Sequence, residues 1–598
     1  MNRIRLPIGN DSFRKMREDE AYYIDKTAII EELLNERGEV YLFTRPRRFG
    51  KTLTMSMLQE FFDISEDSKA IFEGTQIAKN TELCQKYMNQ YPVLFLTLKH
   101  AEGLNFESAF ERLKILISDW CISHEYLIDS PNISQENKEL FYRLISKAVT
   151  EEEVINSLYY LSSLLKNHYG KKVIILIDEY DVPLAQANEN NYYREMMDVI
   201  RVFMGKAFKT NPYLKFAVIT GCLRIAKESI FTGLNNFSSN SISSEQYSQY
   251  FGFTENEVLE LLRKTELEKY ARRIKKWYNG YCFGKTEIYC PWDVLNYVRD
   301  LQYSPNAFPE NYWKNTSHNG IIRSFIDRTD FDIYAKFETL LSGGYICEKV
   351  IEDLTYDVLH CSEDNLWSIL YLTGYLTKAI PEVRDMEKAK QKDMQFSENQ
   401  IQLIEEKVVL EDDTNNIKEQ QILEEEIENI ERKTYLRIPN EEVKTIFAET
   451  IATWFTDNVK KLDRKPIFDA FWSGNEQEVS DFVTDLLFET ISYYDYREDY
   501  YHAFLAGIFV GAGYGVESNK EYGLGRPDIV VKDRKQRQVL LMEVKHSKNE
   551  NEMETDAKTA LQQIDVKQYA RQFLKGFRNV VCYGVAFCEK ECIARKIE

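Results

Sequence analysis

The sequence predicts a multidomain α/β protein with an N-terminal parallel-sheet domain, a helical or winged-helix middle region and a C-terminal α/β domain. The chain has 598 residues, which is too long for one hydrophobic core. Apolar runs typical of buried strands, each ending in polar residues, occur between helical patterns in the first part of the chain. Near the C-terminus, a helical stretch precedes two strands joined by a charged turn. We expect domains at residues 1–250, 251–380 and 434–598, with an insertion at 381–433.

The composition limits the functional classes. Hydrophobic residues make up 44% and charged residues 29%, as in globular proteins, and the net charge is −20. This charge argues against a protein that coats nucleic acid with its whole surface, but it permits a local site. No apolar run is long enough for a membrane helix, and the first residues lack the pattern of a signal peptide. The ten cysteines are scattered, which favours neither zinc nor disulfides, so we expect a cytoplasmic protein without a membrane partner.

The first chemical motif lies between a strand and a helix. Residues 39–44, "EVYLFT", form a short apolar run, and residues 53–62, "LTMSMLQEFF", have apolar side chains at helical spacing. Gly50, Lys51 and Thr52 stand between them. In a P-loop, backbone N–H groups surround phosphate oxygens, a lysine reaches the terminal phosphates and a hydroxyl holds Mg²⁺. This context predicts a P-loop NTPase domain that binds ATP with Mg²⁺.

A second motif follows in "KKVIILIDEYD". The apolar run Val173–Ile177 predicts a buried parallel strand, and Asp178 and Glu179 come directly after it. Ligands of α/β sheets bind at this carboxyl edge. We expect Asp178 to hold the Mg²⁺ water shell and Glu179 to polarise the attacking water.

A third buried strand, Phe216–Ile219, ends in Thr220, and Arg224 lies just beyond it. In P-loop ATPases of the additional-strand type, a polar residue at the end of the neighbouring strand senses the γ-phosphate. A nearby arginine can neutralise developing charge. Thr220 and Arg224 suit these two roles, although Arg224 also fits a structural surface position.

The middle of the chain carries fewer signals. Thr254 and Glu257 predict a capping box at the start of an amphipathic helix. Residues 381–433 contain 16 acidic and 8 basic residues, a net charge of −8, which predicts a solvated helical or disordered insertion. The apolar stretches on either side resemble two strands of a hairpin with the insertion at its tip. The aromatic pairs Trp277-Tyr278 and Tyr312-Trp313 are more typical of a core than of a ligand platform.

The segments "YYIDKT", "TRPRRFGKT", "LIDEYD" and "ITGCLRIAKESIFTGLNN" together resemble the predicted AAA-ATPase-like family of bacterial proteins. The resemblance covers roughly residues 5 to 330 and implies nucleotide binding. An arginine-rich loop without the first glycine is the usual form in that family. Arg45 therefore stands where other P-loops have glycine, and the resemblance implies that Arg45 and Arg48 help to close the loop on phosphate.

A separate constellation lies in "GLGRPDIVVKDRKQRQVLLMEVKHSK". Pro527-Asp528 precedes one strand, and the next strand ends in Glu543-Val544-Lys545. Adjacent antiparallel strands would bring Asp528 and Glu543 together, and alternation places Glu543 and Lys545 on one face. Two carboxylates can hold Mg²⁺ or Mn²⁺, and the lysine can position water or stabilise the transition state. This is the pattern of PD-(D/E)xK nucleases.

The context agrees with this pattern. Glu521 could add a carboxylate, a following helix contains Gln563 and leads to Tyr569, and the strand at 580–587 is expected to close the sheet. Residues 460–598 resemble the restriction-endonuclease-like nuclease-superfamily domain that often follows the AAA-ATPase-like domain. In such folds the glutamine can orient the site, so the resemblance implies supporting roles for Gln563 and Tyr569.

Two classes of function remain open. The first is an ATP-regulated, metal-dependent nuclease, with DNA favoured over RNA, serving defence or mobile-element biology. The second is a nucleotide-dependent switch that reports its state through homo-oligomerisation or a partner, with a nuclease-like domain that only binds nucleic acid. The complete set of Asp528, Glu543 and Lys545 favours the enzyme, whereas the acidic charge of the chain gives weight to the switch.

Overall fold

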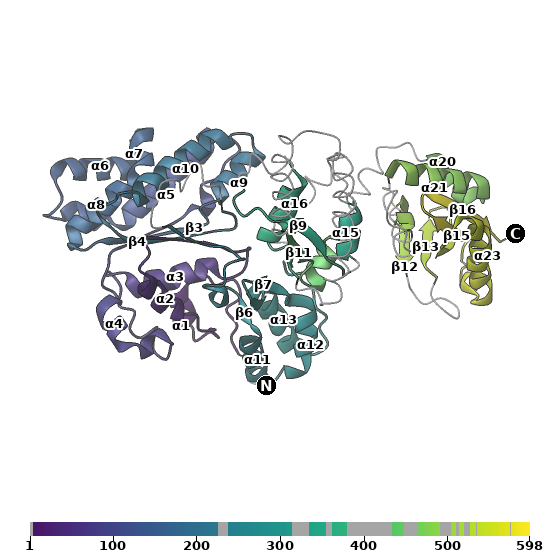
Figure 1. The fold of residues 1–598 in the computed structure, drawn as a ribbon, viewed down its shortest axis with the longest axis horizontal. Helices are drawn as coiled ribbons and strands as arrows, with labels where there is room; N and C mark the ends of the chain where they lie inside the picture. The colour runs from purple at the N-terminus through teal and green to yellow at the C-terminus, as the bar shows by residue number, and fades with distance from the viewer. Residues whose placement is uncertain are drawn as a thin grey trace, which may run out of the picture. The chain divides into compact units, whose positions relative to one another are not determined.

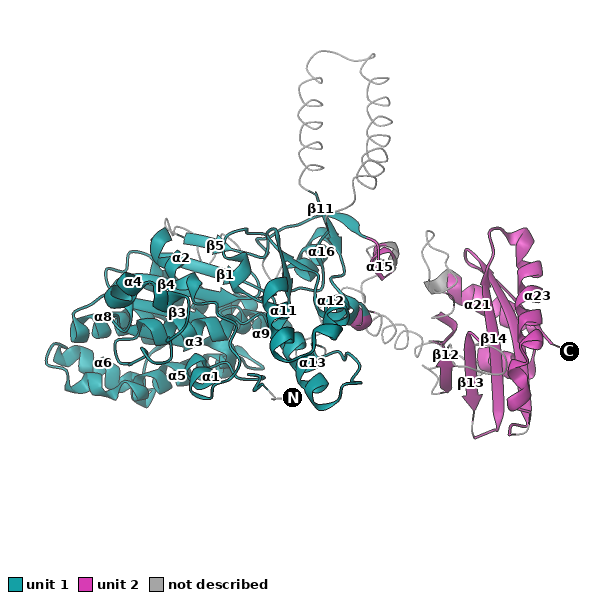
Figure 2. Cartoon of the chain, turned by 90° about the horizontal axis from the view of Figure 1, so that it is seen from below, with its two compact units in different colours: residues 1–317, 345–444 teal, residues 318–344, 445–598 magenta. Residues whose placement is uncertain are grey.

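The structure is a computed structural model that divides into two compact units, residues 1–317 with 345–444 and residues 318–344 with 445–598 (Figure 2). The structure describes residues 4–224, 237–313, 334–341, 343–354, 362–379, 433–447, 465–490, 501, 504–506, 508–509, 514–518, 527–533, 535–574 and 576–597. Among these residues, no helix has the length and apolar character needed to cross a membrane.

The first unit is built on a five-stranded parallel sheet with the order β2-β3-β4-β1-β5. The strand before the glycine–lysine loop, β1, is separated from the strand that ends in Asp178, β3, by the inserted strand β4. The predicted additional-strand arrangement is therefore confirmed. The strands are β1 (Val40–Thr44), β2 (Val93–Thr97), β3 (Val173–Asp178), β4 (Leu214–Gly221) and β5 (Phe237–Asn240).

Helices cover both faces of this sheet, as Figure 1 shows. Every residue of β1 and β3 is buried, because helices pack against both faces and leave no solvated side for polar alternation. One layer contains α1 (Phe13–Glu18), α2 (Ala28–Glu36) and α3 (Lys51–Phe62). The opposite layer contains α5 (Phe106–Ser123), α8 (Ser157–Tyr169) and α10 (Tyr193–Phe208).

The middle region combines helices with small antiparallel sheets. The predicted capping box is present, because Thr254 and Glu257 exchange side-chain and backbone hydrogen bonds at the start of α11 (Glu255–Lys264). Helices α12 (Ala271–Tyr278) and α13 (Pro291–Tyr303) follow. A small antiparallel sheet has the order β6-β8-β7, with β6 (Phe253–Thr254), β7 (Tyr281–Phe283) and β8 (Thr286–Tyr289). Tyr278 and Trp313 are buried, which confirms that these aromatic pairs belong to the core.

The predicted hairpin around the acidic insertion is also present. β10 (Thr377–Lys378) pairs antiparallel with β11 (Lys433–Arg437), and β9 (Ile346–Lys349) completes this three-stranded sheet. Lys433 forms the first residue of β11. The rest of the predicted insertion, residues 381–432, lies outside the described residues.

The second unit contains a mixed sheet with the order β12-β13-β14-β15-β16. One hydrophobic cluster joins the sheet to α20 (Lys465–Ser473) and α21 (Glu476–Thr490), and another joins its other face to α23 (Glu550–Val566). The expectation that the strand at 580–587 closes the sheet is wrong. That strand is β15, and β16 pairs beyond it in a C-terminal hairpin. The strands are β12 (Gly515–Ser518), β13 (Ile529–Asp533), β14 (Gln538–His546), β15 (Asn579–Cys588) and β16 (Glu591–Lys596).

Candidate functional site

The first site is the loop between β1 and α3. Gly50 has a φ of 84°, in the left-handed region where glycine is favoured, and Arg48 also has a positive φ of 72°. Arg45 is not among the residues with positive φ. An arginine at the position usually held by glycine therefore causes no backbone strain, because the left-handed turns of this loop come later.

The start of α3 is suited to an anion. Helix α3 begins at Lys51 and has no side-chain N-cap hydrogen bond, so its first backbone N–H groups are not satisfied by a capping side chain. The Lys51 ammonium is buried and donates to the carbonyl oxygens of Arg45 and Pro46, at 3.0 Å each. These carbonyls hold the lysine inside the loop, at the end of the helix that phosphate would approach.

Asp178 lies between two hydroxyl groups at the carboxyl edge of the sheet. Thr52 Oγ1 donates to Asp178 Oδ2 at 2.7 Å, and Thr220 Oγ1 donates to Asp178 Oδ1. The structure thus brings together three predicted site residues from α3, β3 and β4. A carboxylate with a threonine hydroxyl beside it is an oxygen set that fits Mg²⁺ on a bound nucleotide.

Two further carboxylates follow β3. Burial raises the pKa of Glu179, and the positive charge of Lys51 opposes this shift. Asp181 was not among the predicted site residues. Its Oδ2 accepts the N–H groups of Cys222 and Leu223 at 2.9 and 3.1 Å, so it holds the backbone directly after β4. The spacing of Asp178 and Asp181 in "IDEYD" was the sequence signal that could have identified it.

The Arg45 side chain makes its contacts with backbone carbonyls and aromatic rings, not with Lys51, Thr52 or Asp178. Its side chain is 0% exposed, and its Nη1 donates to the carbonyl oxygens of Thr44 and Asn240 at 2.8 and 2.7 Å. The guanidinium carbon lies 5.1 Å from the ring centre of Phe251 and 5.3 Å from that of Phe283. Burial lowers the pKa of Arg45 to about 9. This placement gives Arg45 a structural role beneath the loop and offers no support for phosphate contact by its side chain.

We expect Arg45→Ala to lower the free energy of unfolding by about 2–4 kcal/mol, since it leaves a cavity and two buried carbonyls without a donor. Arg45→Met should cost less, because it keeps apolar packing against the two phenylalanine rings. Urea denaturation of both variants, with Arg48→Ala as the control from the same loop, measures the difference. Equal stability of Arg45→Ala and Arg48→Ala would contradict the structural role.

The other two predicted arginines have partners away from Lys51. The Arg48 guanidinium stacks 4.2 Å from the ring centre of Trp292. Arg224 forms an ion pair with Asp353 at 2.9 Å, and the two residues also form a parallel β-bridge. Asp353 is more than a hundred residues downstream, so no local pattern could have identified it. Among the described residues, neither arginine forms a hydrogen bond or ion pair with Asp178 or Thr220, whose contacts with each other and with Thr52 are given above.

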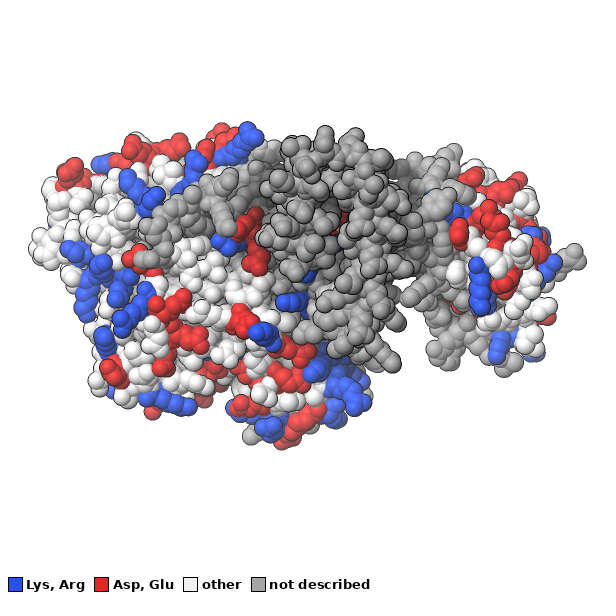
Figure 3. Space-filling model, viewed as in Figure 1, with Lys and Arg blue, Asp and Glu red and all other residues white. Residues whose placement is uncertain are grey.

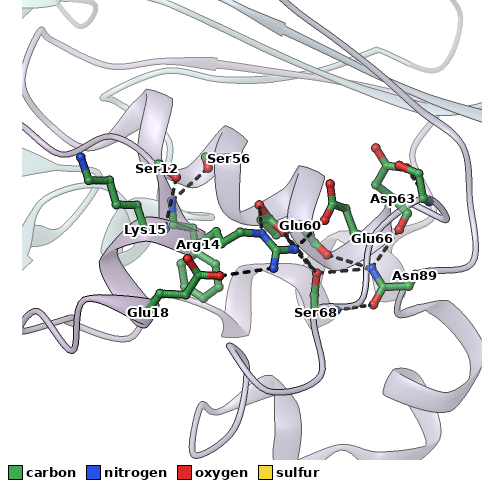
Figure 4. A network of polar contacts seen from close by, with 12 residues as sticks. Ser12, Arg14, Lys15, Glu18, Ser56, Glu60, Asp63, Glu66, Ser68 and Asn89 are labelled. Atoms are coloured by element: carbon green, nitrogen blue, oxygen red, sulfur yellow. Dashed lines mark hydrogen bonds and ion pairs between the residues drawn. The ribbon is translucent and has the colours of Figure 1, made fainter. Parts of the chain in front are cut away.

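Helix α3 is also fixed at its far end by a polar network (Figure 4). Arg14, from α1, forms ion pairs with Glu60 at 2.5 Å and with Glu66 at 2.7 Å. The Asn89 amide donates to the carbonyl oxygens of Glu60 and Asp63 at 3.1 and 2.9 Å. These contacts satisfy carbonyls at the helix C-terminus and position the whole helix, including its N-terminal loop.

The second site lies between β13 and β14. Ile529 pairs with Met542, so Asp528 and Glu543 stand across from each other where the two strands meet. Asp528 Oδ2 accepts the Val544 N–H at 2.8 Å, and Glu543 Oε2 lies 3.4 Å from the Asp528 backbone nitrogen. Glu543 is only 1% exposed. The hairpin therefore brings the two predicted carboxylates together.

Helix α23 adds an amide to this pair. Gln563 Nε2 donates to Glu543 Oε1. This approach depends on Gly584, because a Cβ there would lie 2.1 Å from the Ala557 carbonyl oxygen of α23. Tyr569 instead packs in the hydrophobic cluster with Ile564, and Glu521 lies outside the described residues.

Lys545 follows on the same face as Glu543. Met542 and Val544 belong to the cluster beneath α20 and α21, whereas Leu541 belongs to the cluster beneath α23. Since strand side chains alternate, Glu543 and Lys545 lie on the α23 face. Lys545 is half-buried.

The residues of this site fit a divalent cation. Mg²⁺ is commonly bound through one or two carboxylates and retains water molecules. Asp528 and Glu543 supply such a pair, and a backbone N–H and the Gln563 amide orient their oxygens. Within the described residues, no group of three or more His, Cys, Asp or Glu side chains could hold a metal ion.

Known families match both sites. Residues 7–231 match the family described as "Predicted AAA-ATPase", and residues 496–597 match the "PD-(D/E)XK nuclease superfamily". The first match contains the loop, Asp178 and Thr220. The second contains Asp528, Glu543 and Lys545.

One curated relative is also similar to this chain. It is described as "Uncharacterized protein in vnfD 5'region" from Azotobacter chroococcum mcd 1. The identity is 30% over 319 residues, which cover 53% of this chain and 55% of the relative. The chain therefore spans about half the length of that relative.

Proposed function

The chain joins a predicted AAA-ATPase domain to a PD-(D/E)XK nuclease-superfamily domain, and on this basis we propose that it is an ATP-regulated, metal-dependent nuclease. Its substrate is nucleic acid, with DNA favoured over RNA. The observation that carries the proposal is the convergence of Asp528, Glu543 and Gln563 at the end of the β13–β14 hairpin.

The residues of the nuclease site have distinct roles in this proposal. Asp528 and Glu543 hold Mg²⁺ or Mn²⁺. The bound cation supplies a Lewis acid for the scissile phosphate and lowers the pKa of an attacking water. Gln563 orients the Glu543 carboxylate, because it donates to one of its two oxygens. Lys545 adds a positive charge on the same face, which stabilises the negative charge that develops during cleavage.

In the same proposal, the regulatory nucleotide binds to the first unit. The start of α3 and Lys51 bind the phosphates, and Thr52 with Asp178 holds the Mg²⁺ of the nucleotide. Thr220 donates to the same carboxylate from β4, and this contact supports a role for Thr220 in sensing the γ-phosphate. Glu179 follows Asp178 directly and is the candidate base for hydrolysis.

The purified chain tests the proposal directly. Plasmid, linear DNA and RNA are each incubated with it in Mg²⁺ or Mn²⁺, with and without ATP. We expect cleavage of DNA that stops when EDTA removes the cation and whose rate changes with ATP. Binding of nucleic acid without cleavage under all of these conditions would favour the alternative function, a nucleotide-dependent switch.

A further inference from the structure

One short stretch of the first unit is rich in basic residues. Between residues 263 and 276 the sequence has seven basic and two acidic residues, although the whole chain carries a net charge of −20. Figure 3 shows lysine and arginine side chains gathered at the position of α12. We name the following six residues the basic face: Arg263, Lys269, Arg272, Arg273, Lys275 and Lys276.

Helix α12 points its charges away from the core. Ile274 and Tyr278 are buried in the hydrophobic cluster of the middle region, whereas its four cations are exposed. These cations occupy positions i, i+1, i+3 and i+4, which spread over about half of the helix circumference at 3.6 residues per turn. The packed side fixes the helix, so the cations form a convex surface on a rigid element.

Ion pairs neutralise only part of this face. Lys275 lies 3.2 Å from Glu255 and 3.6 Å from Glu287. Lys276 lies 3.6 Å from Glu441. All of these side chains are more than a third exposed, so water screens the pairs strongly.

The remaining four cations have no carboxylate partner within the described part of the chain. Arg273 bonds the Tyr297 hydroxyl at 3.3 Å, and Lys269 lies over the ring of Tyr270. Arg263 and Arg272 form no ion pair with any described residue. Close spacing of these charges is unfavourable without an anion, so the face is suited to a polyanionic ligand.

We propose that the basic face binds the phosphate backbone of nucleic acid, so that the first unit binds the substrate independently of the nuclease site. Lysine and arginine on a convex helix surface contact phosphates without reading sequence. The choice of nucleic acid as the ligand rests on the proposed function, because nucleic acid is the polyanion that a nuclease binds as its substrate. The nuclease domain has few spare charges of its own, since residues 501–598 contain 16 basic and 13 acidic residues.

The test measures binding separately from cleavage. The full chain with Asp528→Asn is titrated in EDTA against a short fluorescent DNA duplex at several KCl concentrations, and anisotropy is recorded. We expect the additional changes Arg272→Gln, Arg273→Gln, Lys275→Gln and Lys276→Gln to weaken binding at least about tenfold at low salt and to reduce the salt slope by about 3 to 4. The matched control changes Lys69, Lys86, Lys172 and Lys209, which are also exposed, to glutamine and should bind as before.

A second variant guards against a folding defect. Arg263→Gln, Lys269→Gln and Arg272→Gln together leave every ion pair named above intact, and they should still weaken binding. Unchanged affinity in both basic-face variants, or equal loss in the control, would overturn the proposal. Competition by polyglutamate as strong as that by DNA would also overturn it and indicate an acidic protein partner. If the wild-type chain binds through this face but never cleaves, the proposed nuclease function fails while this inference stands.

Discussion

Asp528→Asn and Glu543→Gln are each expected to lower the rate of DNA cleavage at least about 1000-fold, because several kcal/mol of transition-state stabilisation depend on the cation they share. Both substitutions keep the shape of the side chain. The backbone hydrogen bond from Val544 to residue 528 can also be retained, since an amide oxygen accepts it. Cleavage of labelled DNA in Mg²⁺ measures the effect.

Lys545→Ala should affect cleavage and metal binding differently from Asp528→Asn. It removes cleavage but leaves binding of Mn²⁺ nearly unchanged, because lysine is not a ligand. Asp528→Asn should lose both. Calorimetric titration with Mn²⁺ separates the two cases, and a general folding defect would not divide them in this way.

The controls come from the same domain. Asp565→Asn and Lys548→Ala change exposed residues on α23 and just after β14, and both should cut at the wild-type rate. If Asp528→Asn and Lys545→Ala also cut at that rate, the cleavage belongs to another site or a contaminant. The C-terminal domain would then be better described as a binding module.

Local sequence patterns were sufficient to predict the buried strands of the first unit. The apolar runs before Lys51, Asp178 and Thr220 form β1, β3 and β4, because buried parallel strands need continuous apolar side chains. The pairing of Asp528 with Glu543 could also be predicted. A short hairpin leaves little freedom in register once one face is buried.

Contacts between distant segments could not be predicted in this way. The guanidinium of Arg45 lies between β5 and the rings of Phe251 and Phe283, which are about two hundred residues away. The arginines of this loop therefore suggested phosphate binding from the sequence, although the side chain of Arg45 packs inside the core. The ion pair of Arg224 with Asp353 is of the same kind, because each partner alone is an ordinary surface residue.

Lys51→Ala is expected to weaken ATP binding at least about 100-fold, because charge-assisted hydrogen bonds to phosphate contribute about 1.5–3 kcal/mol each. On binding, Lys51 would exchange its two carbonyl contacts for contacts with phosphate. Lys51→Ala therefore destabilises mainly the complex with ATP. Glu179→Gln should behave differently. It keeps affinity, since Glu179 makes no predicted phosphate contact, and it loses hydrolysis.

Calorimetry with ATP and a phosphate-release assay measure these two properties. Lys69→Ala and Glu189→Gln are the matched controls, because both residues are exposed and lie near α3 and on α9 (Val182–Glu189). A wild-type chain that binds no ATP at millimolar nucleotide would refute the P-loop assignment. If Lys51→Ala removes ATP binding and also removes the effect of ATP on DNA cleavage, the two sites are coupled. A cleavage rate that changes neither with ATP nor with Lys51→Ala would show that the nuclease works without nucleotide control.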